Sequence, residues 1–421
     1  MTFEAVHVAL KNAVGGGAYL QGNENYRSRG GFYTWNHGVS IPEEPFKQLA
    51  QVLYDHTPVR NYEGNTLASG DGFGERINLM SITRWLVAEA LRRNDTEAPA
   101  RELLAFLERP SGESLRVRLL HGLQIVEPIL LADGYSLVPF RLIPPSVQKV
   151  AAEAICTETS QFRVGLPLPS ALIYRRPLQR ILFPYDAPPQ DFEGQKKEAA
   201  EADKRFEAVF SVLSLFGPPA VFDIGNWWQA GGPGVPAMGA QSLFWNHETP
   251  IVQKNAICDP TLALTLSSNI LKIIDAGKEG EARKRARGLV RALRRINLSM
   301  RELNPGDAYI DNRIALECGL LGQGAESEKS YRVSIYGAAL LAPNGAERKA
   351  FYDALSLAYK RGSDVVHDGE LKDKDLVDAH VHVREAQALT LKILKELVLR
   401  EGLIDFDKLV LDSPTRVQGT V

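Results

Sequence analysis

An arginine and a histidine near the C-terminal end of the chain are the two residues best placed to do chemistry. Arg361 carries a permanent positive charge, and His367 belongs to the residue type that exchanges a proton near neutral pH. A fixed cation stabilises negative charge that develops on a phosphate. A histidine can remove the proton of an RNA 2′-OH or protonate the leaving 5′-oxygen. The pair therefore suits cleavage of an RNA phosphodiester.

The spacing of this pair sets a condition on the backbone. A straight α-helix turns about 100° per residue, so residues six apart point about 120° away from each other. Arg361 and His367 can share one phosphate only if the helix breaks between them. Gly362 and Ser363 can provide that break, with Ser363 or Asp364 capping a new helix. The alternative is that Arg361 is a solvated cation and His367 a capping or core-edge histidine.

Four stretches around this pair follow one another in a recognisable order. Together they resemble the HEPN superfamily, and within it the Apea-like branch, over roughly residues 262–400. Residues 359–369 resemble its closing theme, Y-x-x-R-S-x-x-V-H-G. In this chain Gly362 stands where that theme has its arginine, so Arg361 and His367 form R-x5-H within the superfamily's R-x4-6-H. The stretches are 290–295, 311–321, 326–341 and 359–369.

The resemblance implies a C-terminal helical bundle that dimerises and cleaves RNA without a metal or other cofactor. In active members, the arginine and histidine line a cleft between two protomers. Carried over to this chain, Arg361 stabilises the transition state, His367 moves the proton, Ser363 positions the phosphate and Glu317 orients Arg361. The expected products carry 2′,3′-cyclic phosphate and 5′-hydroxyl ends.

A row of arginines precedes this region. Their spacing of i, i+4, i+8 and i+11 places them on one stripe of a helix, where they could follow an RNA backbone. The alternative is a solvated or salt-bridged helix face. The four residues are Arg283, Arg287, Arg291 and Arg294.

The composition limits the partners. The formal net charge is −2, so RNA must be held by a local basic patch rather than by the field of the whole protein. The three cysteines form no CxxC pair, and His380 and His382 would point to nearly opposite sides of a helix, so we expect no metal site. The N-terminus lacks a signal-peptide pattern and no long apolar run exists, so we expect a cytoplasmic protein without a membrane span.

The length of 421 residues exceeds one ordinary core and predicts a multidomain α+β protein. Asp133-Gly134 predicts a β-hairpin turn, residues 162–166 and 171–174 predict strands, and residues 217–260 are expected to be irregular. The expected helices are 195–210, 261–276, 281–302, 309–321, 328–341, 346–360 and 374–399. The expected parts are a mixed α/β domain at 1–192 with β-hairpins, a helix and irregular connection at 193–260, the all-α HEPN-like bundle at 261–403, and a tail at 404–421.

The sequence therefore predicts a metal-independent endoribonuclease of HEPN type with an N-terminal sensing or binding domain. The expected partners are RNA, with tRNA as one candidate, and a second copy of the chain bound through the helical bundle. The resemblance also suggests a setting in anti-phage defence or a toxin system. One alternative is a non-catalytic HEPN-like protein that dimerises and binds RNA or a nucleotide, and another is a purely structural or interaction protein.

Overall fold

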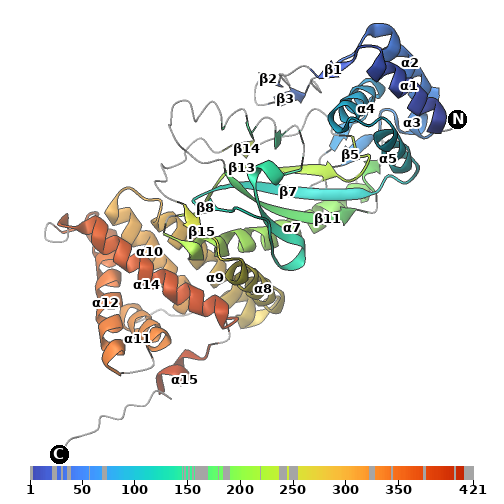
Figure 1. Ribbon diagram of the computed structural model, residues 1–421. Helices are drawn as coiled ribbons and strands as arrows, with labels where there is room; N and C mark the ends of the chain where they lie inside the picture. The colour runs from blue at the N-terminus through green and yellow to red at the C-terminus, as the bar shows by residue number, and fades with distance from the viewer. Residues whose placement is uncertain are drawn as a thin grey trace, which may run out of the picture. The chain divides into compact units, whose positions relative to one another are not determined.

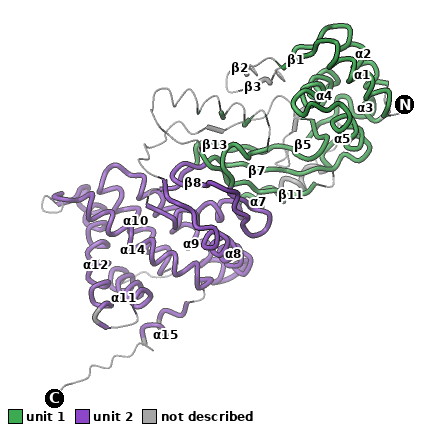
Figure 2. The backbone as a smooth tube through the Cα atoms, viewed as in Figure 1, with its two compact units in different colours: residues 1–119, 138–203, 223–247 green, residues 120–137, 204–222, 248–421 purple. Residues whose placement is uncertain are grey.

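The chain is a mixed α+β protein built from two compact units that interleave along the sequence (Figure 2). Unit 1 comprises residues 1–119, 138–203 and 223–247, and unit 2 comprises residues 120–137, 204–222 and 248–421. The predicted domains were contiguous, whereas these units exchange segments. The computed structural model describes residues 3–20, 26–29, 32–35, 39–55, 57–68, 74–144, 146, 148–149, 152–153, 156, 169–178, 180–183, 190–218, 220–236, 244–245, 255–321, 328–342, 345–372, 376–402 and 404–411.

Unit 1 begins with a group of helices that share one apolar core (Figure 1). Leu10, Leu49, Leu53 and Leu86 are buried in this core because each lies on the apolar face of its helix. The helices are α1 (Phe3–Gly15), α2 (Glu43–Asp55), α3 (Thr57–Tyr62), α4 (Leu79–Arg93) and α5 (Glu97–Glu108).

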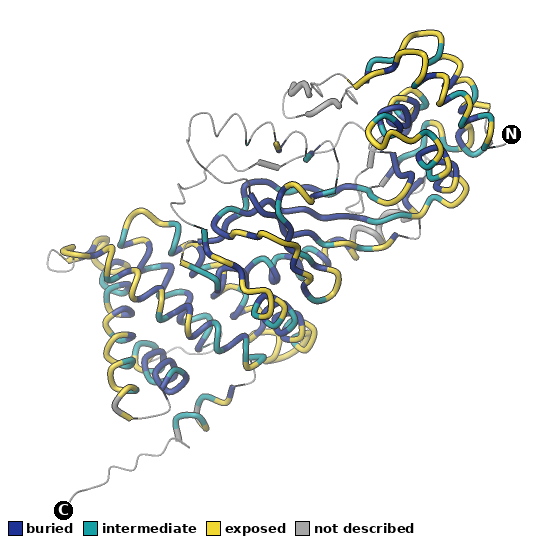
Figure 3. The backbone as a smooth tube through the Cα atoms, in the orientation of Figure 1, coloured by how far each residue is buried: buried dark blue, intermediate teal, exposed yellow. Residues whose placement is uncertain are grey.

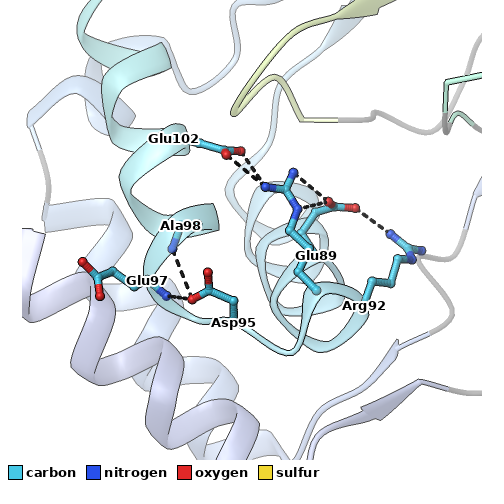
Figure 4. A network of polar contacts seen from close by, with 7 residues as sticks. Glu89, Arg92, Asp95, Glu97, Ala98 and Glu102 are labelled. Carbon is cyan, nitrogen blue, oxygen red and sulfur yellow. Dashed lines mark hydrogen bonds and ion pairs between the residues drawn. The ribbon is translucent and has the colours of Figure 1, made fainter.

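Polar contacts fix the corner between α4 and α5 (Figure 4). Arg93 donates to both carboxylate oxygens of Glu102, at 3.0 and 2.9 Å, and to Glu89 at 3.2 Å. Asp95 accepts from the backbone N–H of Glu97 at 2.8 Å, which caps the start of α5. These contacts hold two helices that are separated by a short turn.

Four strands of the main sheet lie in unit 1 in the order β14-β13-β7-β11, and β7 is buried along most of its length (Figure 3). Strand β13 lies where the sequence predicted an irregular region, because Phe222, Ile224 and Trp227 find buried positions that the local sequence does not reveal. The predicted strand at 171–174 is confirmed within β11, while the one at 162–166 lies outside the described residues. The bounds are β7 (Gly112–His121), β11 (Ser170–Leu178), β13 (Phe222–Gly231) and β14 (Phe244–Trp245).

Shorter strands complete unit 1. In one small sheet β5 pairs with both β12 and β6, and two further pairs join β1 to β4 and β2 to β3, all antiparallel. The bounds are β1 (Tyr19–Leu20), β2 (Tyr26–Arg29), β3 (Phe32–Trp35), β4 (Val39–Ser40), β5 (Thr66–Ala68), β6 (Gly74–Arg76) and β12 (Leu182–Phe183).

In unit 2 the predicted hairpin at Asp133-Gly134 is confirmed. Strand β9 (Ile129–Leu130) pairs antiparallel with β10 (Tyr135–Pro139), with Leu130 opposite Ser136. Asp133 and Gly134 have φ angles of 53° and 80°, the left-handed conformation that a tight turn needs. A parallel pair of β8 (Leu123–Gln124) and β15 (Ala256–Ile257) lies elsewhere in the unit.

The rest of unit 2 is a helical bundle, as the spacing of apolar residues predicts. The helix predicted at 195–210 is α7, whose residues 190–203 belong to unit 1 and residues 204–212 to unit 2. Among the described residues, no helix is long and apolar enough to cross a membrane. The helices are α7 (Gln190–Val212), α8 (Pro260–Ala276), α9 (Gly280–Ser299), α10 (Pro305–Leu320), α11 (Lys329–Leu341), α12 (Gly345–Asp368), α14 (Ala379–Leu399) and α15 (Phe406–Leu411).

Helices α12 and α15 differ from the expected ranges, and the difference changes the position of the candidate catalytic residues and of the tail. Helix α12 runs eight residues past the predicted end at 360, so it includes Arg361 and His367. Helix α15 occupies the start of the predicted tail at 404–421, and residues 412–421 lie outside the described residues.

Candidate functional site

Helices α10 and α12 pack closely at Gly362. A Cβ atom added there would lie 2.8 Å from the backbone oxygen of Tyr309 and 3.0 Å from the Cβ of Arg313. Further along, Val365 packs against Gly306, which shows that the two helices run antiparallel. The absence of a side chain at Gly362 thus serves close helix packing.

The break that the sequence predicted at Gly362 and Ser363 does not occur, since residues 345–368 form one unbroken helix. Arg361 and His367 therefore point about 120° apart. Arg361 is partly buried and donates from Nη1 to the hydroxyl of Tyr309 at 3.0 Å. His367 is exposed to solvent. A single chain does not bring the two onto one phosphate.

Ser363 does share a face with His367, because residues four apart lie nearly one above the other on a helix. Ser363 is partly buried and His367 is exposed, one turn beyond it towards the end of α12. The structure therefore places two of the predicted catalytic residues, a hydroxyl and an imidazole, on one face of α12 and points Arg361 away from that face.

Glu317 joins α10, α11 and α12 through three contacts. It accepts from the Tyr359 hydroxyl at 2.7 Å, from Arg313 Nε at 2.9 Å and from Lys329 Nζ at 3.4 Å. None of its hydrogen bonds or ion pairs within the described part of the chain goes to Arg361. The predicted contact between Glu317 and Arg361 is thus replaced by a contact with Tyr359, two residues earlier on α12.

The local environment shifts the pKa values of both Glu317 and Tyr359. Burial alone disfavours the charged form of Glu317, but hydrogen bonds from Tyr359 and Arg313 outweigh it, so the pKa of Glu317 lies below its usual range. Burial, and then the hydrogen bond to Glu317, raises the pKa of Tyr359 to about 12. Glu317 is therefore ionised and Tyr359 neutral at neutral pH, which suits a structural contact rather than proton transfer.

Sequence reasoning did not single out Tyr309, Arg313 or Tyr359. The spacing of Arg313 and Glu317, four apart on one helix, could have revealed their ion pair. The guanidinium of Arg313 also lies over the ring of Tyr359, 4.7 Å from its centroid. That contact and the hydrogen bond between Arg361 and Tyr309 join distant parts of the chain, so no local sequence pattern predicts them.

The arginine stripe of α9, defined as Arg283, Arg287, Arg291 and Arg294, is confirmed as an exposed row on one helix. The opposite face of α9 buries Leu289, Leu293 and Ile296 against the bundle. This amphipathic division fixes which side of the helix meets solvent.

The four guanidiniums differ in their contacts. The guanidiniums of Arg283 and Arg287 have no hydrogen bond or ion pair within the described residues. Arg294 pairs with Glu207 at 3.3 Å. Burial raises the pKa of the Cys318 thiol, although the positive charge of Arg291 acts to lower it. The first half of the arginine stripe is therefore available to an anionic partner without breaking an existing contact.

No cluster of three metal-ligating side chains occurs in the part of the chain that the structure describes. Comparisons of the chain with protein-family models, curated proteins and solved structures gave no match. Any functional conclusion must therefore rest on the residues themselves.

Proposed function

We propose that unit 2 binds RNA through the arginine stripe of α9. The observation that carries this proposal is the exposure of all four guanidiniums on one face, two of them without a partner in the described residues. The stripe spans about 16 Å along the helix axis and about 80° around it. Such a row can contact successive phosphates of one strand.

The overall charge supports a local rather than a global mode of binding. Because the chain has a formal net charge of −2, RNA gains no attraction from the protein as a whole. The ordered stretches within α9, α10, α11 and α12 support a HEPN-type bundle as the scaffold, with a second copy of the chain as the expected partner. RNA binding is common to the catalytic and the non-catalytic forms of this proposal.

Fluorescence anisotropy with a labelled tRNA and a labelled unstructured RNA tests the binding. The double variant Arg283→Ala/Arg287→Ala should weaken binding about tenfold or more, since each phosphate contact contributes to affinity. Arg285→Ala is the matched control, because Arg285 is an exposed residue of α9 that points about 160° away from both Arg283 and Arg287. Equal binding by both variants would refute the proposed surface.

A second candidate function is metal-independent RNA cleavage. The observation that favours it is the solvent-facing position of His367 with Ser363 one turn away on the same face. Because α12 is unbroken and Arg361 is held by Tyr309, one chain cannot supply the arginine and the histidine to one phosphate. We therefore place the catalytic form in a homodimer, where a second chain completes the site.

A further inference from the structure

The strand β7 at the centre of unit 1 presents two different faces. Leu115, Val117 and Leu119 alternate along one face, which is apolar and buried. Arg116 and Arg118 lie on the other face and are also buried. A sheet face covered by a helix is normally apolar, so two buried arginines on that face need a reason.

The neighbouring strands extend the charged face. Arg176 of β11, beside β7, has a side chain only 12% exposed, and that of Arg116 is 9% exposed. On the other side of β7, Trp228 of β13 lies under the guanidinium of Arg116, 5.2 Å from the ring centre. We call Arg116, Arg118, Arg176 and Trp228 the sheet-face cluster.

Two carboxylates of α7 pair with arginines of the sheet-face cluster. Asp203 pairs with Arg116, and Glu198 pairs with Arg176 at 3.2 Å. These carboxylates are far more exposed than the guanidiniums, at 45% for Asp203 and 68% for Glu198. A solvent-exposed carboxylate keeps most of its hydration, so it can exchange a guanidinium partner for water at little cost. The carboxylates of Glu198 and Asp203 can therefore be displaced by another anion.

The opposite face of the same sheet offers a direct comparison. There Arg175, next to Arg176 on β11, pairs with Glu113 of β7 at 3.1 Å. Both side chains of that pair are exposed, as in an ordinary surface ion pair. Of these two neighbouring arginines, the one on the face under α7 is the less exposed, at 12% against 47%.

We propose that the sheet-face cluster binds a nucleoside phosphate, whose phosphate groups replace the carboxylates of Glu198 and Asp203. Guanidiniums bind phosphate oxygens in pairs of parallel hydrogen bonds, and three of them on adjacent strands match a di- or triphosphate. The indole of Trp228 supplies a stacking surface for the base. This site is independent of the RNA-binding stripe, which lies in unit 2.

The site gives the two carboxylates of α7 a specific role. They pair with Arg116 and Arg176 in the absence of ligand, whereas Arg118 pairs with Asp223 of β13 at 3.8 Å, and they must move aside when phosphates bind. Removal of their charge should therefore strengthen ligand binding. If these ion pairs were purely structural, removal of the carboxylate charges would destabilise the sheet and would not strengthen ligand binding.

Isothermal titration of the full chain with ATP tests the site, with adenosine and inorganic phosphate as separate titrants. We expect ATP to bind, adenosine not to bind because it lacks phosphate, and phosphate to bind about tenfold or more weakly than ATP because it cannot stack. Glu198→Gln/Asp203→Asn should tighten ATP binding about tenfold, and Arg176→Gln should weaken it about tenfold.

Glu113→Gln and Arg175→Gln are the matched controls on the other face of the sheet, and both should bind ATP like the unchanged chain. The melting temperature of each variant reports whether it is folded. Absence of ATP binding in both the unchanged chain and Glu198→Gln/Asp203→Asn would overturn the proposal. Equal losses in Arg176→Gln and Arg175→Gln would also overturn it, and equal affinity for phosphate and ATP would remove the role of Trp228.

Discussion

The hydroxyl of Tyr359 on α12 donates a hydrogen bond of 2.7 Å to the carboxylate of Glu317 on α10. The two residues are 42 positions apart in the sequence, and Glu317 also holds Arg313 and Lys329. This contact fixes α12 against α10 about half a turn before Arg361 and about two turns before His367. It therefore helps to set the directions of Arg361 and His367.

Replacement of Tyr359 by phenylalanine should lower the free energy of unfolding by about 1–2 kcal/mol, because the partly buried Glu317 loses a strong hydrogen bond. Urea denaturation followed by circular dichroism measures the change. Tyr352→Phe is the control, since Tyr352 lies on the same helix and contacts Tyr331 through its ring. Equal effects of the two substitutions would contradict a special role for the Tyr359 hydroxyl.

The contribution of Glu317 to stability should depend on pH. Its pKa is lower in the folded chain than in the unfolded chain, so its stabilisation is present in full above about pH 4.3 and is lost as the pH falls below that value. The difference in unfolding free energy between the unchanged chain and Glu317→Gln should be constant from pH 7 to about pH 5 and then shrink. A difference for Glu317→Gln that stays constant below about pH 5 would refute the assignment.

The sequence predicted the local features of the fold better than the long-range ones. The turn at Asp133-Gly134 follows from residue types that accept positive φ angles, and the exposed row on α9 follows from helical spacing. The break at Gly362 was expected from the flexibility of glycine. Tertiary packing overrides that tendency, because Gly362 lies against the backbone of Tyr309 and the helix continues through it. The partners of Glu317 and Arg361 could not be predicted because they come from distant segments.

Gly362→Ala should destabilise the chain by about 1–3 kcal/mol, although alanine normally favours a helix over glycine. The added methyl group would meet the backbone oxygen of Tyr309 at 2.8 Å, and backbone yields less easily than a flexible side chain. Gly194→Ala in α7 is the control, because a Cβ there meets nothing within 4 Å and should stabilise by about 0.5–1 kcal/mol. A gain of stability in both variants would show that α10 and α12 pack less closely than described.

Cleavage of RNA, if the homodimer is catalytic, should persist in EDTA and leave 2′,3′-cyclic phosphate ends. His367→Ala should reduce the rate about 10²–10⁴-fold through loss of acid–base help, and Arg361→Ala should also reduce it. His380→Ala, at another exposed histidine of unit 2, should leave the rate unchanged. Gel analysis of tRNA and total RNA measures all three, and activity that survives His367→Ala or requires a divalent metal would exclude this mechanism.

The salt dependence of RNA affinity tests the central claim most directly. Contact of the four stripe arginines with phosphates predicts that the logarithm of the association constant falls with the logarithm of salt concentration with a slope of about −3 for a single strand. The slope should fall to about −1.5 in Arg283→Ala/Arg287→Ala and stay near −3 in Arg285→Ala. A slope that is unchanged in the double variant would contradict RNA binding through the arginine stripe of α9.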